Sequence, residues 1–447
     1  MQLSLPHPNN SSGSLPSPPG VLVSTTVIEE QRRQREGARS LKAADDVILP
    51  TTSFIYPLHA HSGTHHAYLY IGSPPQRQTL IVDTGSRITA FPCRPHCPDC
   101  GIHASEQFSL NKSSSHEVVP CSSCLLSKSN TEEMLENERL GGLRGSKELP
   151  NSCYNNQCEI EQSYTEGSSW RAFEVKDKVW LGTDDNMASV KDHQSHAAPF
   201  VFGCQVSEEG LFKKQYADGI MGLSMYTQTL FKTFNEEGVI PHESFSLCFN
   251  KAGGYLAVGG AAVKNHLSPM QFTPFAKNNT WYYTVNVKAI YVGSHMLPQI
   301  FMKFMNDYKG TIVDSGTTDT FLPQKIAKPF LKAWQSITGR SYSNSLQLYT
   351  YEQFSKLPPI TFELDGGVHW EVEPFKYMED VADNTRVSLE PWHGKRGFIS
   401  RMYVTEPRGA VLGSNAMMDH DVYFDVANRR LGIAKASCIS NFELKLS

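Results

Sequence analysis

Two aspartates in matching local sequences are the residues of this chain whose types and spacing could do chemistry. Asp83 lies in TLIVDTGS (79–86), and Asp314 lies in GTIVDSGTT (310–318). Two carboxyls held a few ångströms apart cannot both ionise easily, so they share one proton and one apparent pKa rises. The ionised member can then take a proton from water while the protonated member donates to a carbonyl oxygen. The pair therefore predicts general acid and general base catalysis without a covalent intermediate.

The residues around each aspartate suit that chemistry. Each aspartate ends an apolar run typical of a strand and is followed by a hydroxyl residue, a glycine and a second hydroxyl residue. Gly85 and Gly316 allow a close turn of the backbone. The hydroxyls of Ser86 and Thr317 can each donate to an outer carboxylate oxygen. One such motif alone is more typical of a turn than of a catalyst, but two copies favour the catalytic interpretation.

A second short element repeats together with the Asp motifs. DGIMGLS (218–224) is echoed by AVLGSN (410–415), each with two apolar residues before a glycine. The order is Asp motif, apolar pair with glycine, Asp motif, apolar pair with glycine. This internal duplication predicts two similar lobes in one chain.

The elements that must position the aspartates are mostly strands. From Thr51 onward, short runs rich in Val, Ile, Tyr, Phe and Thr are bounded by Gly, Pro and Asn, as in 67–86 and 281–294. The better helical patterns are 230–240 and 324–337, where apolar residues recur at three- and four-residue steps. We expect an all-β, bilobal fold with the active-site cleft between two β lobes.

Composition along the chain suggests where the domains lie. Residues 1–48 are rich in Ser, Pro and charge without apolar periodicity, which predicts a disordered leader or prosegment. We expect an N-terminal lobe over 49–265, with a Cys-rich insert at 93–158 and a flap at about 160–172, and a C-terminal lobe over 266–447. The formal net charge of −4 is interspersed, which argues against nucleic acid as a partner.

Ten cysteines indicate an oxidising compartment, and seven of them crowd into the insert. We expect disulfides at Cys93, Cys97, Cys100, Cys121, Cys124, Cys153, Cys158, Cys204, Cys248 and Cys438. Because seven is an odd number, at least one cysteine of the insert must pair with a cysteine outside it. Cys204 is the candidate partner, which leaves Cys248 to pair with Cys438. The spacing of the cysteines leaves the connectivity open. The alternative is a zinc site built from the first five cysteines with His96 and His103.

Cysteine usage predicts the secretory pathway, yet the printed chain shows neither a signal peptide nor a membrane anchor, which suggests that the natural chain continues at one or both ends. We expect a monomer that acts on a peptide or protein, without a cofactor or metal. Serine, cysteine and metallohydrolase signatures such as G-x-S-x-G and H-E-x-x-H do not occur.

Together IVDTGS, IVDSGTT, GIMGLS and VLGSN resemble the pepsin-like aspartic proteases, from about Ala67 to Cys438. The resemblance implies catalysis by Asp83 and Asp314 and a flap tyrosine at Tyr164. Many members carry a tryptophan shortly after the first Asp motif, where this chain has Ala90. The tryptophan partner of the flap is therefore expected to be missing and the pocket beside Tyr164 to be wider.

Within that family, FPCRPHCPDCGIH, SCYNNQCEIEQSYTEGSS and LFKKQYADGIMGLS resemble the plasmepsin V-like and nepenthesin-like branch. That resemblance implies that Glu166 and Gln215 hold a basic substrate residue near the cut. The plasmepsin V-like proteases have a cysteine directly after the flap tyrosine where this chain has Thr165, a departure that bears on the identity of the substrate. The alternative function is a catalytically silent binding protein or inhibitor with the same fold.

Overall fold

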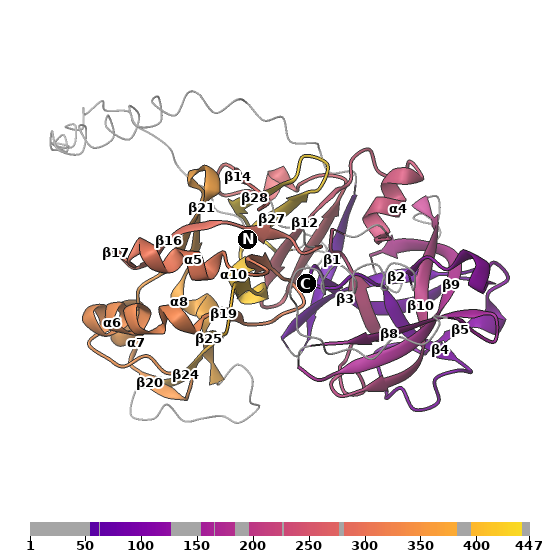
Figure 1. Cartoon of the computed structure of the whole chain (residues 1–447), viewed down its shortest axis with the longest axis horizontal. Helices are drawn as coiled ribbons and strands as arrows, with labels where there is room; N and C mark the ends of the chain where they lie inside the picture. The colour runs from indigo at the N-terminus through magenta and orange to yellow at the C-terminus, as the bar shows by residue number, and fades with distance from the viewer. Residues whose placement is uncertain are drawn as a thin grey trace, which may run out of the picture. The chain divides into compact units, whose positions relative to one another are not determined.

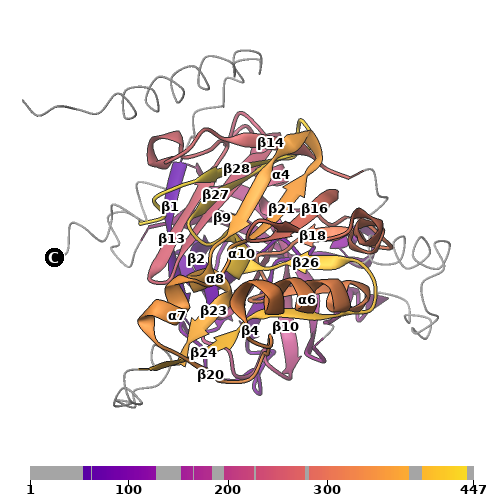
Figure 2. The same cartoon turned by 90° about the vertical axis from the view of Figure 1, so that its left-hand side faces the viewer.

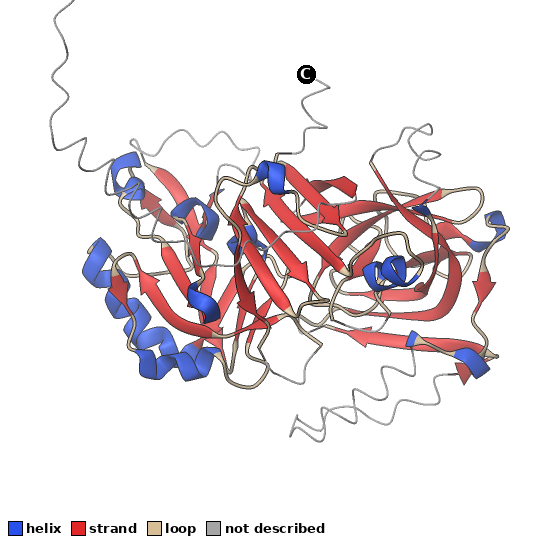
Figure 3. Cartoon of the chain, turned by 90° about the horizontal axis from the view of Figure 1, so that it is seen from above, coloured by secondary structure: helices blue, strands red, loops and turns tan. Residues whose placement is uncertain are grey.

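The computed structural model describes residues 54–61, 63–126, 153–164, 166–183, 196–225, 228–276, 281–381 and 395–439. Residues 49–447 form one compact unit, to which all of the described residues belong. The predicted leader, 1–48, lies outside the described residues, as does Thr165. Strands dominate the described part, as the red ribbons of Figure 3 show, so the all-β prediction is confirmed.

A sixteen-stranded sheet among the described residues joins strands from both halves of the sequence. Its order is β14 (Gln271–Pro274), β28 (Arg430–Lys435), β27 (His420–Asp425), β12 (Ser244–Asn250), β13 (Gly253–Val258), β1 (Phe54–His61), β2 (Thr64–Ile71), β3 (Gln76–Asp83), β11 (Gly219–Gly222), β4 (Ala90–Arg94), β10 (Ala198–Glu209), β9 (Ser169–Gly182), β8 (Gln157–Ser163) and β7 (Cys153–Tyr154), with β5 (Phe108–Ser109) beside β4 and β6 (Glu117–Val118) beside β9.

Three smaller sheets lie in the C-terminal half. They are formed by β15 (Thr284–Val285), β18 (Thr311–Val313), β26 (Ala410–Leu412), β19 (Thr320–Pro323) and β25 (Met402–Glu406); by β17 (His295–Met296), β16 (Val287–Val292), β21 (Ile360–Leu364) and β22 (His369–Val372); and by β20 (Gln347–Tyr349), β24 (Arg396–Ser400) and β23 (Met378–Asp380).

The helices of the described part are short. The α-helices are α4 (Leu230–Glu236), α5 (Met302–Met305), α6 (Ala327–Thr338), α7 (Tyr351–Ser355), α8 (Pro374–Tyr377) and α10 (Ser414–Met417), and the 3-10 turns are η1 (Leu110–Lys112), η2 (Cys121–Ser123), η4 (Val263–Asn265), η5 (Gln299–Phe301), η6 (Gln324–Ile326) and η7 (Asp365–Gly367). Both predicted helical patterns are confirmed, by α4 and by η6 with α6. Figure 2 looks onto the C-terminal half with α6 across the front.

The two halves meet through β12 and β27, which pair antiparallel from Ser244 opposite Asp425 to Cys248 opposite Asp421. In Figure 1 the indigo to magenta half and the orange to yellow half lie on either side of these strands. These hydrogen bonds join residues that lie on opposite sides of the predicted lobe boundary between residues 265 and 266. The boundary itself stays a prediction. Apolar residues of both halves, such as Val82 and Val313, belong to one buried core.

The duplicated sequence elements fold into the same three-strand unit twice. In the N-terminal half, β11 pairs parallel with β3, with Gly222 opposite Asp83, and antiparallel with β4. In the C-terminal half, β26 pairs parallel with β18, with Leu412 opposite Val313, and antiparallel with β19. The apolar residues of β11 and β26 are buried, which explains their continuous apolar runs. Each Asp motif therefore follows an interior strand with neighbours on both sides.

The glycine of each repeat makes room for the loop after its aspartate. A Cβ on Gly222 would lie 2.5 Å from the backbone nitrogen of Ile88. A Cβ on Gly413 would lie 2.5 Å from the carbonyl oxygen of Thr317 and closer still to that of Asp319. Backbone approaches this close exclude any side chain. The apolar pair followed by glycine is thus a packing requirement of the Asp motif.

Candidate active site

Asp83 and Asp314 face each other where the two repeated units meet. Asp83 accepts hydrogen bonds from Gly85 N at 2.7 Å and from Ser86 Oγ at 2.5 Å. The second motif repeats this pattern, because Asp314 accepts from Gly316 N at 2.9 Å and from Thr317 Oγ1 at 2.6 Å. In each motif the glycine N–H binds Oδ1 and the hydroxyl binds Oδ2.

Gly85 and Gly316 have no side chain, which allows the two carboxyls to lie close together. A Cβ on Gly85 would lie 2.6 Å from Oδ1 of Asp314. A Cβ on Gly316 would overlap the carboxyl of Asp83 in the same way. Each glycine therefore faces the aspartate of the opposite motif, and any side chain there would push the carboxyls apart. Glycine is therefore required at these positions for a second reason besides the close turn. This reason is contact with the opposite motif, which the sequence alone does not show.

Thr84 and Ser315 link the motifs, and sequence reasoning assigned them no role. Thr84 Oγ1 donates to Val313 O at 3.0 Å and accepts from Ser315 N at 2.9 Å. Ser315 Oγ donates to Val82 O at 2.8 Å and accepts from Thr84 N at 3.0 Å. Both side chains are buried. The signal in the sequence was the small hydroxyl residue directly after each aspartate.

The electrostatics of the pair favour one retained proton. Burial raises the pKa of Asp83 well above its usual range, and the negative charge of Asp314 raises it further. Hydrogen bonds from Ser86 and Gly85 oppose this shift, whereas a hydrogen bond with Asp314 adds to it. A buried carboxyl in hydrogen-bond contact with a second carboxyl keeps a proton at pH values where an isolated carboxyl loses it.

Tyr164 lies at the turn of the hairpin formed by β8 and β9, within the predicted flap. Burial raises its pKa, and the nearby charge of Asp83 adds to the shift. Its hydroxyl accepts a hydrogen bond from Trp170 Nε1 at 3.2 Å. Hydrogen bonding to Ser86 also acts on the Tyr164 hydroxyl, so the hairpin turn reaches the first Asp motif.

The expectation that Tyr164 lacks a tryptophan partner is wrong. Trp170 comes from β9, six residues after the tyrosine, and is 1% exposed. It packs in one buried cluster with Ala90, whose small side chain leaves space for the indole. The tryptophan absent from position 90 is thus supplied from another strand. The wider pocket beside Tyr164 stays a prediction.

Glu166 and Gln215 lie on two segments that contact each other. Glu166 is exposed in the turn between Tyr164 and Ser168. Gln215 is half-buried at the end of the loop 210–216, whose Leu211 N donates to Ser168 Oγ at 2.9 Å. The segments that carry the two residues are in contact, and no hydrogen bond between Glu166 and Gln215 is present among the described residues; their joint role stays a prediction. The loop also packs on the flap through Phe212, whose ring centroid lies 5.1 Å from that of Tyr164.

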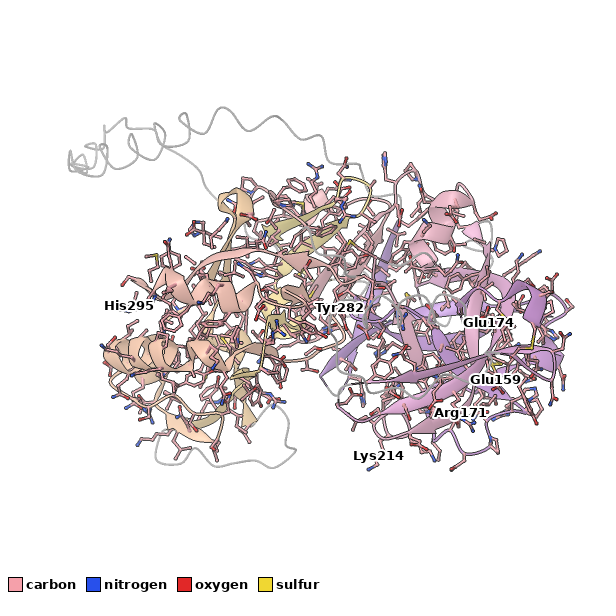
Figure 4. The ribbon with its side chains drawn as sticks, viewed as in Figure 1. Glu159, Arg171, Glu174, Lys214, Tyr282 and His295 are labelled. Atoms are coloured by element: carbon pink, nitrogen blue, oxygen red, sulfur yellow. A yellow bond between two sulfur atoms is a disulfide. The ribbon has the colours of Figure 1, made fainter. Side chains whose placement is uncertain are left out.

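Tyr282 is a further residue near the pair that sequence reasoning missed. Burial raises its pKa, and the charges of Asp314 and Asp83 add to the shift. Figure 4 places its side chain near the junction of the two halves. The preceding Trp281 receives the guanidinium of Arg87 5.3 Å from its ring centroid. Neither the periodicity nor the motifs of 281–294 marked these aromatic residues, because contact across the halves is a tertiary property.

All ten cysteines lie in the described part of the chain and are paired. The disulfides are Cys93–Cys204, Cys97–Cys100, Cys121–Cys153, Cys124–Cys158 and Cys248–Cys438. Cys204 is thus the partner outside the cluster, and Cys248 joins Cys438. One group with metal-ligand spacing, Cys124, Cys158 and Glu174, is present among the described residues. Its two sulfurs form a disulfide, so they offer no thiolate to a zinc ion.

The helices in the described ranges are all too short or too polar to cross a membrane.

Comparison with protein families and known proteins agrees with this geometry. Residues 66–260 match the family model described as xylanase inhibitor N-terminal, and residues 282–435 match the one described as xylanase inhibitor C-terminal. The two matches together cover more than half of the chain. The first includes Asp83 with the flap hairpin, and the second includes Asp314.

Individual relatives are aspartic proteases. Plasmepsin V of Plasmodium falciparum is 33% identical over 195 residues, which are 42% of this chain and 28% of that protein. Aspartic proteinase nepenthesin-2 of Nepenthes gracilis is 25% identical over 356 residues, covering 76% of this chain and 72% of that protein. Aspartyl protease AED1 of Arabidopsis thaliana is 24% identical over 425 residues, covering 90% and 78%.

The match to plasmepsin V thus spans less than a third of that relative, whereas the plant relatives match over most of their length. The paired Asp motifs, the repeated strand units and the matches across both halves lead to one assignment. The chain belongs to the pepsin-like aspartic protease family and has its bilobal β fold.

Proposed function

We propose that this chain is an aspartic endopeptidase in which Asp83 and Asp314 activate a water molecule. The observation that supports the proposal is the symmetrical pair itself. Each carboxyl accepts one backbone and one hydroxyl hydrogen bond, and the two carboxyls are also in hydrogen-bond contact. The donors fix both carboxyl groups, so the pair is organised before a substrate binds.

The reaction follows from one shared proton. The carboxylate of the pair takes a proton from water, and the carboxyl donates its proton to the oxygen of the attacked peptide carbonyl. A tetrahedral intermediate forms, and return of a proton to the leaving nitrogen breaks the carbon–nitrogen bond. The hydroxyls of Ser86 and Thr317 hold the outer oxygens, which leaves the inner ones for water and substrate.

The test is cleavage of a mixed peptide library at several pH values by the wild-type chain and by three variants. Asp83→Asn, Asp314→Asn and the double variant should all lose activity to a similar extent, because a coupled pair has no spare member. Hydrogen exchange should show that each variant keeps the wild-type fold. Ordinary turnover by well-folded Asp314→Asn would contradict the mechanism.

We infer further that the flap side selects a substrate with a basic residue near the cut. Glu166 offers a carboxylate, and Gln215 offers an amide from the loop that contacts the same hairpin. A carboxylate beside an amide oxygen suits the several N–H donors of a guanidinium. The 33% identity to plasmepsin V over 195 residues supports this choice.

The specificity test compares peptides that carry Arg, or Ala in its place, at each position near the cut. Glu166→Gln should reduce the preference for Arg, with little change for the Ala peptides. Glu159→Gln is the matched control, because Glu159 is also exposed and lies on β8 of the same hairpin (Figure 4). Equal preference in Glu166→Gln and the wild-type chain would contradict this part of the proposal.

A second candidate is an inhibitor or binding protein, because the matching family models are described as xylanase inhibitor domains. The paired aspartates favour the protease, since an inhibitor does not require them. Binding of a glycoside hydrolase without any peptide cleavage would favour the inhibitor.

The five disulfides support a secretory compartment, where such bonds form and persist. A monomer acting on a peptide or protein completes the proposal.

A further inference from the structure

His103 of the Cys-rich insert is buried against the loop that carries Gln215. Its side chain is 3% exposed, and its Nε2 lies 3.2 Å from Oε2 of Glu208, which is 0% exposed. Its Nδ1 lies 3.1 Å from the carbonyl oxygen of Gln215. The imidazole therefore links Glu208, near the end of β10, to Gln215 in the loop that follows this strand.

Both ring nitrogens of His103 face only acceptors. Nδ1 meets the Gln215 carbonyl, and Nε2 meets the Glu208 carboxylate and the Cys100 carbonyl. These acceptors favour an imidazolium, in which both ring nitrogens carry a proton. Burial lowers the pKa of His103, but the contacts with Glu208 and Gln215 outweigh burial and raise that pKa to about 9. A positive ring paired with a buried carboxylate resists displacement, since either charge alone would be costly.

The insert holds the same loop at three further points. Ala104 N donates to Tyr216 O at 2.9 Å. Lys213 Nζ lies 2.6 Å from Asp99 Oδ2, inside the Cys97–Cys100 disulfide loop. Gly101 packs directly on the carbonyl of Lys213, where a Cβ could not fit. Lys214, between these contacts, is exposed and lies at the outer edge of this half in Figure 4.

The far side of the loop contacts the flap. Leu211 N donates to Ser168 Oγ, and Phe212 packs on Tyr164. A Cβ on Gly210 would lie 2.7 Å from Ser168 Oγ, so the backbones are closely apposed. The loop is thus held between the insert on one side and the hairpin that carries Glu166 on the other.

We propose that His103, held by Glu208, is a positioning residue for the loop 211–216, so that the Cys-rich insert sets peptide selectivity through Gln215. The selectivity rests on the proposed function, whereas the positioning does not. The His103 contact is to the Gln215 backbone, and the buried amide nitrogen of the Gln215 side chain has no hydrogen-bond partner among the described residues. Loss of the contact should therefore change substrate selectivity more than turnover.

The test uses the full chain with His103→Phe, which keeps a planar ring without donors, and the milder Glu208→Gln. Hydrogen exchange should become faster over 211–217 in both variants. The ratio of kcat/KM for Arg and Ala peptides should fall about tenfold, because small displacements of a binding group are costly. The kcat for the Ala peptide should stay close to the wild-type value.

His266→Phe is the matched control, because His266 is 7% exposed and pairs with the 0% exposed Asp421 at 2.8 Å in the C-terminal half. It should leave exchange over 211–217 and selectivity unchanged. His103→Phe should have no further effect on selectivity in a Gln215→Ala background, since it acts through that residue. Additive effects, or unchanged exchange over 211–217 in both test variants, would overturn the inference. A wild-type chain that cleaves nothing would refute the proposed function, while exchange would still decide the positioning role.

Discussion

Thr84 and Ser315, one from each Asp motif, exchange hydrogen bonds in which each backbone N–H donates to the side-chain oxygen of the other, at 3.0 and 2.9 Å. Each side chain also donates to a carbonyl of the opposite strand. The positions of the two carboxyls relative to each other therefore depend on four hydrogen bonds made by neighbouring residues.

Thr84→Val should keep the shape of this link and remove its polar contacts. Ser315 N and Val313 O would be left buried without partners, which should cost about 1–3 kcal/mol of unfolding free energy. Activity should fall by at least about tenfold, since the carboxyls lose their fixed separation. Thr273→Val is the control, because the buried hydroxyl of Thr273 has no hydrogen-bond partner among the described residues. Chemical denaturation and peptide cleavage measure both effects; equal losses in the two variants would contradict the role of Thr84.

Ser86→Ala should move the alkaline limb of the pH–activity profile to higher pH. The Ser86 hydroxyl donates to Asp83 and lowers the pKa of that carboxyl, so its removal raises the pKa further. The shared proton is then retained to higher pH. Ser246→Ala removes a buried hydroxyl that has no hydrogen-bond partner within the described ranges and should leave the limb in place. An alkaline limb that stays fixed or moves down in Ser86→Ala would count against a proton shared at Asp83.

Asp83→Asn should stabilise the folded chain at neutral pH while it removes activity. The pKa of Asp83 is raised in the folded state, mainly by burial, so its effect on stability is most favourable below its unfolded pKa. The contribution of Asp83 to the free energy of unfolding is lost as the pH rises from its pKa in the unfolded state through its pKa in the folded state. The amide has no such loss. Urea unfolding at several pH values should show a smaller decline above pH 4 in the variant, and an identical decline would disprove the linkage.

Trp170→Phe should weaken substrate binding more than it weakens turnover. The variant keeps most of the packing against Ala90 but removes the donor to Tyr164 Oη, so the hairpin turn loses its anchor. KM should rise by up to about tenfold, in line with the loss of one hydrogen bond. Trp180→Phe on the same strand is the control, because the buried Nε1 of Trp180 has no hydrogen-bond partner in the part of the chain that the structure describes. A KM equal to that of the control would contradict the anchoring role.

Replacing Cys248 and Cys438 together by serine should destabilise the chain without changing selectivity. This disulfide closes a sequence separation of 190 residues and joins β12 to the segment after β28. Loss of such a cross-link typically costs about 2–5 kcal/mol. Urea unfolding of the double variant measures the cost. A loss of Arg preference in the folded variant would show that this bond also acts on the substrate side.

Local patterns were enough to predict several features of this protein. An apolar run before Asp, a glycine two residues later and hydroxyls around it describe a strand and a turn, because these residues act on their own backbone. The recurrence of that pattern, together with the repeat at 218–224 and 410–415, indicated two similar lobes. Residues 230–240 and 324–337 showed the three- and four-residue period of α4 and α6.

The tertiary structure decided which distant residues meet. The contact of Thr84 with Ser315 joins residues 231 positions apart, and the pairing of Cys93 with Cys204 joins residues 111 positions apart. Trp170 lies beside Ala90 and takes the place of a tryptophan at position 90. This is possible because packing depends on which side chain fills a volume, whatever its position in the sequence. The protonated state of His103 likewise follows from the acceptors that the fold places around both of its nitrogens.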